Sequence, residues 1–374
     1  MQNNNIHILH LSAVTNWGGG ENHIENLCSE LSITNPEVKN TIFCVNNSPF
    51  HERLKNTGIQ FTTATLGIKI DPRYIFELGR FCKKETINLI HIHDPSAIQL
   101  AIIADKLYNL PPFIFSKKTS FPIKQRKKTL YKYNYSKIKK ILCVSEETKK
   151  VAEKGIYDHD KLITIYHGTN LKTKSSETSF QLRDKYNIPK SKKIIGNIAN
   201  HIRAKHLDTW VDIADNLINK EKRNDFFFVQ IGTFTERTEA LLNRIKELKL
   251  ENYMLFLGYT INASNFIPQF DISLITSQSE GIPQFIYESM YHKVPVITTN
   301  VGGIPEIIEH NNNGLLSDMH DHKTLANHVV NLSKNPQLQM DFIEKGYKKL
   351  IENFTTNNMA QQTLVVYKKT VNNA

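Results

Sequence analysis

The sequence predicts an α/β protein of two domains, each a doubly wound parallel sheet covered by helices. The chain of 374 residues is too long for one ordinary domain and suits two of ~150 to 200 residues each. Short apolar runs alternate with helical stretches through both halves, which is typical of βαβ units. Hydrophobic residues make up 40% and charged residues 22% of the chain, as in globular proteins.

One stretch, residues 277–303, predicts how a ligand binds. Its sequence, SQSEGIPQFIYESMYHKVPVITTNVGG, follows an apolar run and indicates strand, loop, helix and strand, with the helix beginning near Pro283. In an open parallel sheet, ligands bind at the carboxyl ends of strands, and the free amides of a helix start favour a phosphate. Glu280 lies in the loop, and Glu288 lies about a turn and a half into the helix. A carboxylate there can accept hydrogen bonds from two sugar hydroxyls, as on a ribose, so the stretch predicts a nucleotide-sugar site.

The same stretch resembles a known family. Glu280 and Glu288 within SEGIPQFIYES, followed by PVITTNVGGIPEII, resemble the retaining glycosyltransferases of family 4, which have the GT-B fold. Two glutamates at this spacing are common, and solvated helix-end glutamates are the simpler interpretation of the spacing alone. The resemblance covers nearly the whole chain. It is made specific by the flanking residues, which are Ser279, Gly281, Pro283, Pro295, Gly302 and Gly303.

The resemblance implies a domain organisation. Two Rossmann-like domains are expected to face each other across a central cleft. Residues 1–170 would form the acceptor-binding domain, and residues 192–352 the nucleotide-sugar-binding domain. The polar stretch 171–191 is expected to be the linker, and residues 353–374 a helix that packs back on the N-terminal domain.

The resemblance also assigns the donor site. Glu280 is expected to contact the sugar ring and Glu288 the ribose. Lys205 matches the family's pyrophosphate-binding lysine, whereas Asn200 stands where the family has an arginine, and Arg203 is close enough in sequence to supply that charge. The other expected donor-binding residues are Gly281, Ile282, Gln284 and Phe285, of which the last three would shape the donor pocket, and Tyr259, near the nucleotide base.

Two histidines end an apolar strand in the first half of the chain. Pro95 stops this strand, so His93 and Asp94 are expected at its carboxyl end. The sequence HIHDP resembles the family pattern in which the second histidine lies beside the reacting sugar, so His93 joins Glu280 as a catalytic candidate. For His91, a buried core histidine is the preferred interpretation.

A glycine run follows the first predicted strand. Gly19, Gly20 and Glu21 precede a helix expected over residues 22–31, and such a run can cradle a phosphate or simply form a flexible turn. The sequence is similar to the family's loop that faces the donor phosphates and the acceptor, so these three residues are expected there. The G-x-G-x-x-G dinucleotide pattern is absent.

The formal net charge of +11 indicates an anionic partner. Ten Lys or Arg and no acid lie in residues 117–140, interleaved with aromatic residues. This stretch predicts docking on an anionic membrane surface, and a solvated surface helix is the competing interpretation. Nucleic acid is not an expected partner, because the charge is concentrated away from the cleft motifs.

Compartment and cofactors follow from what the sequence contains. It shows no run of ~20 apolar residues and no signal-peptide pattern, which favours a cytoplasmic protein, peripheral on the inner face of the cell membrane through residues 117–140. No acid-rich metal-binding pattern such as D-x-D lies between the two halves, so neither a metal nor another cofactor is expected. Four widely spaced cysteines are expected to be buried free thiols: Cys28, Cys44, Cys82 and Cys143.

The predicted function is a metal-independent retaining glycosyltransferase. It would move a sugar from a nucleotide-sugar donor, expected to be UDP-linked, to a hydroxyl of a glycan or lipid-linked acceptor in cell-envelope polysaccharide biosynthesis. The alternative is a catalytically weak or inactive GT-B partner subunit that binds nucleotide or glycan. Two departures from the family pattern favour the alternative: Asn200, and His167 in place of the asparagine of the family's Asn-Gly turn.

Overall fold

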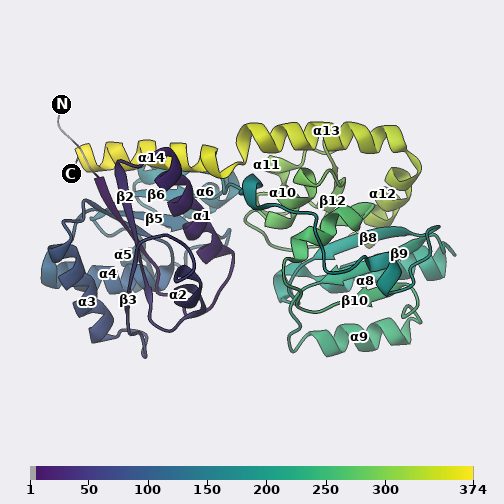
Figure 1. Cartoon of the computed structure of the whole chain (residues 1–374), viewed down its shortest axis with the longest axis horizontal. Helices are drawn as coiled ribbons and strands as arrows, with labels where there is room; N and C mark the ends of the chain where they lie inside the picture. The colour runs from purple at the N-terminus through teal and green to yellow at the C-terminus, as the bar shows by residue number, and fades with distance from the viewer. Residues whose placement is uncertain (1–5, 374) are drawn as a thin grey trace. The chain divides into compact units, whose positions relative to one another are not determined.

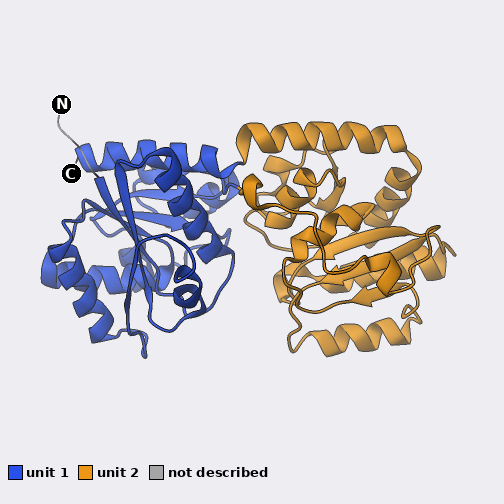
Figure 2. Cartoon of the chain, viewed as in Figure 1, with its two compact units in different colours: residues 1–168, 355–374 blue, residues 169–354 orange. Residues whose placement is uncertain are grey.

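The computed structural model describes residues 6–373 and divides into two compact units (Figure 2). Unit 1 holds the described residues up to Gly168 and from Thr355 onward, and unit 2 holds Thr169–Phe354. Each unit is a parallel sheet flanked by helices, as the sequence predicts (Figure 1).

Unit 1 contains a seven-stranded parallel sheet in the order β3-β2-β1-β4-β5-β6-β7. Its strands are β1 (Ile6–Leu11), β2 (Val38–Val45), β3 (Phe61–Ala64), β4 (Leu89–Ile92), β5 (Phe113–Lys117), β6 (Ile138–Cys143) and β7 (Leu162–Thr164). Its helices are α1 (Gly19–Thr34), α2 (Pro49–Leu54), α3 (Pro72–Lys84), α4 (Pro95–Tyr108), α5 (Lys127–Tyr133), α6 (Glu146–Glu153), the 3-10 turn η1 (His159–Lys161) and α14 (Thr356–Asn372).

The central strands of unit 1 are buried on both faces. Every residue of β1 is buried, which is why its sequence, IHILHL, is nearly continuous in apolar residues. Histidines His7 and His10 interrupt the run, and both rings are buried and hydrogen-bonded. The strand therefore carries polar groups into the core only where they find partners.

The last helix, α14, completes unit 1. Its buried residues recur at helical spacing, and Met359, Leu364 and Tyr367 pack with Leu27 and Leu31 of α1 in one core cluster. The Thr356 hydroxyl donates to Glu30 of α1 over 2.8 Å. Figure 1 shows this C-terminal helix beside α1, although the two are far apart in sequence.

Unit 2 contains a six-stranded parallel sheet in the order β10-β9-β8-β11-β12-β13. Its strands are β8 (Lys193–Ile198), β9 (Phe226–Ile231), β10 (Met254–Phe256), β11 (Ile272–Leu274), β12 (Val296–Thr299) and β13 (Leu315–Ser317). Its helices are η2 (Leu171–Thr173), α7 (Leu182–Lys185), η3 (Arg203–Lys205), α8 (Leu207–Asp215), the π-helical η4 (Asn216–Lys220), α9 (Thr238–Glu247), η5 (Ala263–Gln269), α10 (Gln284–Tyr291), α11 (Ile304–Ile307), α12 (His322–Lys334) and α13 (Pro336–Asn353). Trp210, Phe226 and Phe228 are fully buried in its main core.

Two local details differ from the sequence-based expectation. Helix α1 begins at Gly19 with Gly18 as its N-cap, so Gly19 and Gly20 form its first turn instead of preceding it. Residues 171–191 fall within unit 2, where they form η2, α7 and several contacts with its body. Gln269, for example, accepts a hydrogen bond from the Leu182 amide over 2.7 Å, which anchors the segment.

The four cysteines are free and buried, as expected. Burial raises the pKa of each thiol to about 12 or higher, so the thiols stay protonated and unreactive. Within residues 6–373, no helix is both long and apolar enough to cross a bilayer.

Candidate functional site

Each sheet reverses its strand order at one point, and the candidate residues lie there. In unit 1 the order reverses between β1 and β4; His10 lies near the end of β1, and His93 directly follows β4. In unit 2 it reverses between β8 and β11, and the loops after these strands carry Lys205 and Glu280. Open α/β sheets bind ligands outside the carboxyl ends of strands at such switch points, so both units have a site-forming edge.

Lys205 and Glu280 form an ion pair at the switch point of unit 2. The Lys205 ammonium lies 2.6 Å from Oε1 of Glu280, and the Ser277 hydroxyl donates to the same oxygen over 2.6 Å. The carboxylate side chain is only 9% exposed. The loops after β8 and β11 are also joined by the Gln278 amide, which donates to the Ala204 carbonyl over 2.8 Å. The pair is therefore held by two connected loops.

Glu288 lies one helix further along the same stretch and has its own lysine. Lys174, from the segment before α7, places its ammonium 2.5 Å from Oε1 of Glu288. Both side chains are mostly buried. His292 lies nearby, and burial lowers its pKa to about 4, with the Lys174 charge adding to the effect. The second glutamate is thus neutralised by a residue that the sequence places in a linker.

Gly302 is required by the position of the Glu280 loop. Its φ of +57° lies in the left-handed region, and a Cβ at this position would lie 1.9 Å from the Glu280 carbonyl oxygen. The Gly303 amide donates to the Gly281 carbonyl over 2.9 Å, which ties the same two loops together. The glycine pair after β12 therefore fixes the loop that carries the first glutamate.

The remaining predicted donor residues differ in exposure. Ile282 and Phe285 are 8% and 6% exposed and belong to the core. Gln284, at the start of α10, is partly exposed. The expectation that Ile282, Gln284 and Phe285 shape a donor pocket stays a prediction. Tyr259 is 75% exposed after β10.

Asn200 has a structural partner. Its Oδ1 accepts a hydrogen bond from the Thr233 amide over 3.0 Å, joining the loops after β8 and β9. Arg203 lines a cavity of about 340 Å³ in unit 2, together with His201, His206 and Arg237, and neither Lys205 nor Glu280 lines it. Arg203 thus lines a hollow to which the two ion-pair residues do not contribute.

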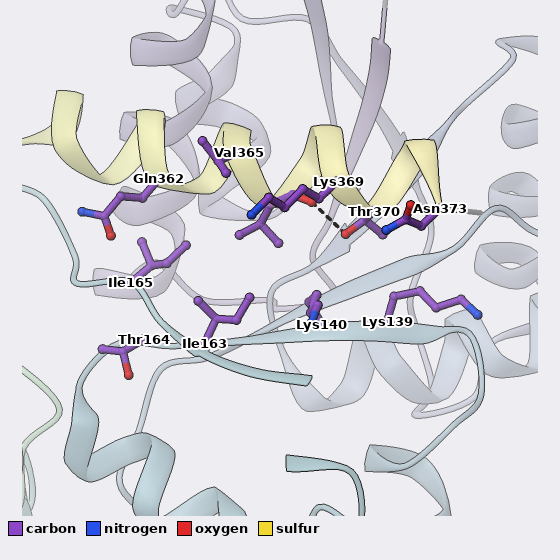
Figure 3. A pocket seen from close by; sticks show the side chains of 11 residues that line it. Lys139, Lys140, Ile163, Thr164, Ile165, Gln362, Val365, Lys369, Thr370 and Asn373 are labelled. Carbon is purple, nitrogen blue, oxygen red and sulfur yellow. Dashed lines mark hydrogen bonds between the residues drawn. The ribbon is translucent and has the colours of Figure 1, made fainter. Parts of the chain in front are cut away.

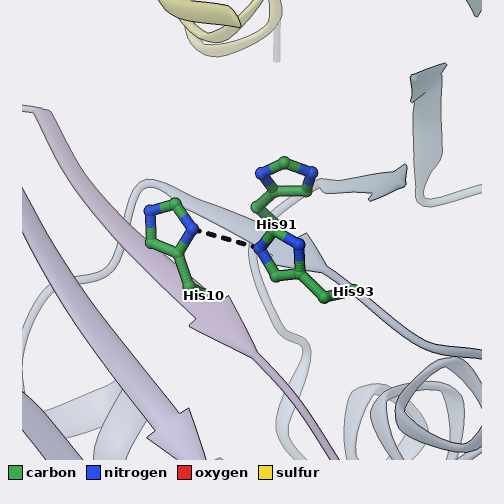
Figure 4. A group of neighbouring side chains, drawn as sticks. All are labelled: His10, His91 and His93. Carbon is green, nitrogen blue, oxygen red and sulfur yellow. Dashed lines mark hydrogen bonds between the residues drawn. The ribbon is translucent and has the colours of Figure 1, made fainter. Parts of the chain in front are cut away.

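Three buried histidines meet at the switch point of unit 1 (Figure 4). Nδ1 of His10 and Nε2 of His93 lie 3.1 Å apart, and the rings of His91 and His93 lie 4.0 Å apart although β4 ends between them. His91 is hydrogen-bonded at both nitrogens, to the Tyr367 hydroxyl over 2.5 Å and to Ser116 over 2.8 Å. Burial lowers the pKa of His10 to about 4 and that of His93 well below its usual range, so both rings are neutral.

Further cationic and imidazole groups surround these histidines. The rings of His23, on α1, and His167 stack at 4.1 Å, and burial lowers the pKa of His167 to about 3. The Lys118 ammonium donates to the Gly20 carbonyl over 2.9 Å, and burial lowers its pKa to about 8, against the opposing effect of Glu21. The edge therefore combines neutral imidazoles with one partly buried amine.

The glycine loop lies at this edge. Gly19 has open space around it, whereas a Cβ on Gly20 would lie 3.6 Å from the Lys118 ammonium. Glu21 is buried, which raises the pKa of its carboxyl. The structure thus brings Gly20 and Glu21 beside Lys118, a residue of the basic stretch.

The histidines His10, His91 and His93 are also, among the described residues, the group that could hold a metal ion, with ligand nitrogens within 4.8 Å of one another. Both nitrogens of His10 and of His91 are already hydrogen-bonded, as is Nε2 of His93, whereas Nδ1 of His93 has no partner among the described residues. A metal bound by His10 Nδ1 and His93 Nε2 would displace the proton that these two nitrogens share. The expectation of a metal-independent protein stays a prediction.

Two other hollows of unit 1 lie away from this edge. A cavity of about 520 Å³ lies between α14 and the strands β6 and β7, with Lys139, Lys140 and Lys369 among its lining residues (Figure 3). Lys139 and Lys140 lie near the amino end of β6, opposite the histidine edge. A second cavity, of about 420 Å³, lies between α4 and α5. Its lining includes Ile102, Ile103, Tyr131 and four lysines: Lys106, Lys127, Lys128 and Lys132.

The sequence did not single out several residues that the structure places at these edges. They are Asn40, His10, His23, Lys118, Lys174 and Ser277. A histidine inside an apolar strand was the available signal for His10. Lys174 carried none, because its role depends on a contact between residues 114 positions apart.

Two family models match the chain. The model described as Glycosyltransferase Family 4 matches residues 17–173, and that described as Glycosyl transferases group 1 matches residues 178–349. Together they cover most of both units. The match boundary at residues 173–178 falls close to the division between the units.

Several related proteins are glycosyltransferases by name. The chain is 27% identical over 204 residues to N-acetyl-alpha-D-glucosaminyl L-malate synthase of Bacillus anthracis, covering 54% of this chain and 52% of that protein. It is 21% identical over 322 residues to the UDP-Gal:alpha-D-GlcNAc-diphosphoundecaprenol alpha-1,3-galactosyltransferase of Escherichia coli, covering 82% and 83%. The match thus spans about half the length of the first relative and most of the second.

Solved structures share the fold. Anabaena Alr3699/HepE in complex with UDP superposes with a TM-score of 0.84 at 16% identity, covering 97% of this chain and all of that one. A glycosyltransferase from Rickettsia africae gives 0.84 at 22% identity, covering 99% and all of that chain. The predicted GT-B fold, with two parallel-sheet domains, is confirmed. The chain belongs to the family 4 glycosyltransferases.

Proposed function

We propose that this protein transfers a sugar from a UDP-linked donor to a hydroxyl group of a cell-envelope glycan or lipid-linked acceptor, with retention of configuration. The observation that carries the proposal is the pairing of Lys205 with Glu280 at the switch point of unit 2, with Glu288 on the following helix. The Escherichia coli relative, whose name gives a UDP-linked donor and a diphosphoundecaprenol-linked acceptor, supports this choice of substrates.

The residues of unit 2 would hold the donor. Lys205 turns from Glu280 to the donor pyrophosphate, where its charge stabilises the departing diphosphate. Glu280, released from the lysine, contacts the sugar ring, and Glu288 accepts hydrogen bonds from the ribose hydroxyls. The amides at the start of α10 add partial positive charge toward the phosphates.

In the transfer step, the bond from the anomeric carbon to the diphosphate oxygen breaks, and a bond to the acceptor oxygen forms on the same face. The acceptor hydroxyl loses its proton to the leaving diphosphate, which balances the charge. We infer that His93 of unit 1 hydrogen-bonds a sugar hydroxyl. Because no step uses a metal, transfer is expected to proceed unchanged in a chelator.

A panel of UDP- and GDP-linked sugars tests this function, with released nucleoside diphosphate and thermal shift scored together on the purified full chain. Release with one UDP-sugar, in the presence of membrane extract as acceptor source, is the expected result. The absence of both diphosphate release and thermal shift with every donor in the panel would overturn the proposal.

A catalytically weak or inactive partner subunit is the second candidate. The observation that favours it is Asn200, whose side chain binds the Thr233 amide, while Arg203 lines a separate cavity. The diphosphate would then meet one cation, Lys205, where the family pattern supplies two. A thermal shift with UDP, without release of diphosphate even with membrane extract, distinguishes this candidate from the enzyme.

We further propose that residues 117–140 dock unit 1 on an anionic membrane. The cavity between α4 and α5 combines apolar isoleucines with four lysines, a combination that suits anionic lipid. Flotation with phosphatidylglycerol-containing vesicles tests it. The wild type is expected to float, and a variant with Lys127 and Lys128 replaced by glutamine to float less; equal failure of both to bind would refute docking.

A further inference from the structure

We propose that Asn40 and His10 are positioning residues that hold His93 in the tautomer with a bare lone pair on Nδ1, so that the group His93 meets in the site is a hydrogen-bond donor, a hydroxyl. The proposal rests on the proposed function for the identity of that hydroxyl, which belongs to the sugar or the acceptor. The direction of a buried chain of hydrogen bonds follows from atoms that can only donate or can only accept.

The chain begins at a backbone carbonyl. The Val38 carbonyl can only accept, so the Asn40 side chain must direct its Nδ2 toward it, at 3.0 Å. Oδ1 of Asn40 then faces Nε2 of His10, at 3.1 Å. Because Oδ1 can only accept, Nε2 of His10 must carry the proton.

The next link passes this direction to His93. A neutral His10 with its proton on Nε2 has a lone pair on Nδ1, and that atom lies 3.1 Å from Nε2 of His93. Nε2 of His93 must therefore donate across the contact that Figure 4 marks with a dashed line. His93, neutral in turn, keeps the lone pair on Nδ1.

Burial keeps every member of the chain neutral. Asn40, His10 and His93 are 6%, 0% and 4% exposed. Protonating His10 would bury a positive charge, and the nearby charge of Lys118 disfavours protonation further. The tautomer is thus set by the chain and not by exchange with water.

The free end of the chain is the functional atom. Nδ1 of His93 is buried and has no hydrogen-bond partner among the described residues. A buried lone pair without a donor costs free energy, which a ligand hydroxyl would recover. A phosphate or carboxylate oxygen would instead meet lone pair against lone pair, so this atom selects a hydroxyl.

The tautomer of His91, by contrast, is not fixed by its hydrogen-bond partners. Its nitrogens contact the hydroxyls of Tyr367 and Ser116, and each hydroxyl can donate or accept. No backbone group fixes its tautomer through these contacts. The directed chain through Asn40 and His10 therefore distinguishes His93 from its neighbour.

Nitrogen NMR of the full chain tests the proposal directly. Long-range proton–nitrogen spectra of ¹⁵N-labelled protein at pH 7 report which ring nitrogen carries the proton, and His93→Gln assigns the His93 signals. The wild type is expected to show Nε2 protonated and Nδ1 bare. A wild-type His93 protonated at Nδ1 would overturn the proposal.

Three variants separate positioning from folding. Asn40→Leu and His10→Leu break the hydrogen-bond chain that fixes the His93 tautomer. We expect the Nδ1-protonated form of His93 to appear in both. His10→Gln keeps it, because the amide nitrogen can donate to Asn40 and the amide oxygen can accept from His93, so the wild-type pattern should return. His159→Gln, at an exposed site in unit 1, is the matched control and should leave the His93 signals unchanged. An unchanged His93 pattern in a folded leucine variant contradicts the proposal.

Kinetics provide the second readout. His10→Leu is expected to lower kcat for transfer about tenfold with little change in the donor KM, and His10→Gln to restore most of it. A restored His93 tautomer without restored kcat would contradict a positioning role. The spectra report the His93 tautomer whether or not the protein turns over substrate. Absence of transfer by the wild type would therefore overturn the proposed function, and the spectra would still test the tautomer.

Discussion

Lys174 lies 2.5 Å from Glu288 in unit 2, and both side chains are mostly buried. The two residues come from segments that the sequence assigns to different roles, one to a linker and one to a ribose contact. The pair therefore ties the segment that enters unit 2 to the helix expected to hold the nucleotide.

Removing one member of this pair should cost more than removing both. Lys174→Met leaves a buried carboxylate without its partner, and about 3 kcal/mol of stability is expected to be lost. Combining it with Glu288→Gln removes the stranded charge, so the double variant should melt closer to the wild type than Lys174→Met does. Thermal unfolding of the four proteins measures the coupling, and strictly additive shifts would show that the pair is not coupled.

Replacing Gly302 by alanine should displace the loop that carries Glu280. The new Cβ would lie 1.9 Å from the Glu280 carbonyl oxygen, at a φ of +57° that alanine rarely adopts. We expect a loss of about 2 kcal/mol or more and weaker binding of UDP. Gly58→Ala is the matched control, because nothing lies within 4 Å of its added Cβ. Equal melting temperatures for the two variants would be incompatible with this packing.

Stability of unit 1 should fall in mild acid. In the unfolded chain His10 titrates near its usual pKa of 6.5, whereas burial holds its pKa at about 4 in the folded protein. The unfolded state therefore binds more protons between these values, and stability is present above pH 6.5 and lost as the pH falls toward 4. His10 alone accounts for about 3 kcal/mol by pH 4.

His10→Gln isolates this contribution. Its melting temperature is expected to fall less steeply than that of the wild type between pH 7 and 4.5, since one buried titrating group is gone. Both proteins carry the same carboxylates, so their effect cancels in the comparison. Identical slopes would mean that His10 is not held neutral by burial.

Much of the fold could be predicted from the sequence because its signals are local. Short apolar runs predicted the strands, Pro95 marked the end of the strand that became β4, and Pro283 marked the start of α10. The start of α1 was placed three residues late, because three glycines in a row indicate a turn. Here, tertiary packing and the N-cap at Gly18 carry the helix through two of them.

The candidate site could be predicted only in part. Glu280, Glu288 and Lys205 were found through motif spacing, and the structure places Lys205 against Glu280. Lys174 and Asn40 could not be found, because their roles arise from contacts between segments distant in sequence. For His10, its position inside an apolar strand was a signal, but its contact with His93 could not be predicted. Burial of Ile282 and Phe285 was likewise invisible, since apolar residues beside a glycine loop suit a pocket wall as well as a core.

Glu280→Gln should lower transfer while the protein stays folded. The amide keeps the size of the side chain and an acceptor for Ser277, but loses the charge that pairs with Lys205. A fall in kcat/KM of about 100-fold is expected, equivalent to about 2.7 kcal/mol of transition-state stabilisation. Glu251→Gln, at an exposed position of unit 2, should transfer at the wild-type rate. Unchanged transfer by Glu280→Gln would remove this residue from the site.

The central claim is that the switch point of unit 2 binds a nucleotide sugar, and calorimetric titration of UDP-glucose or the donor selected in the panel measures it most directly. The titration compares the wild type with Lys205→Met and with Lys220→Met, an exposed lysine of the same unit. We expect the wild type and Lys220→Met to bind equally and Lys205→Met to bind at least about tenfold more weakly, a difference of about 1.4 kcal/mol. Equal affinity in all three proteins, or no binding by the wild type, would contradict the claim.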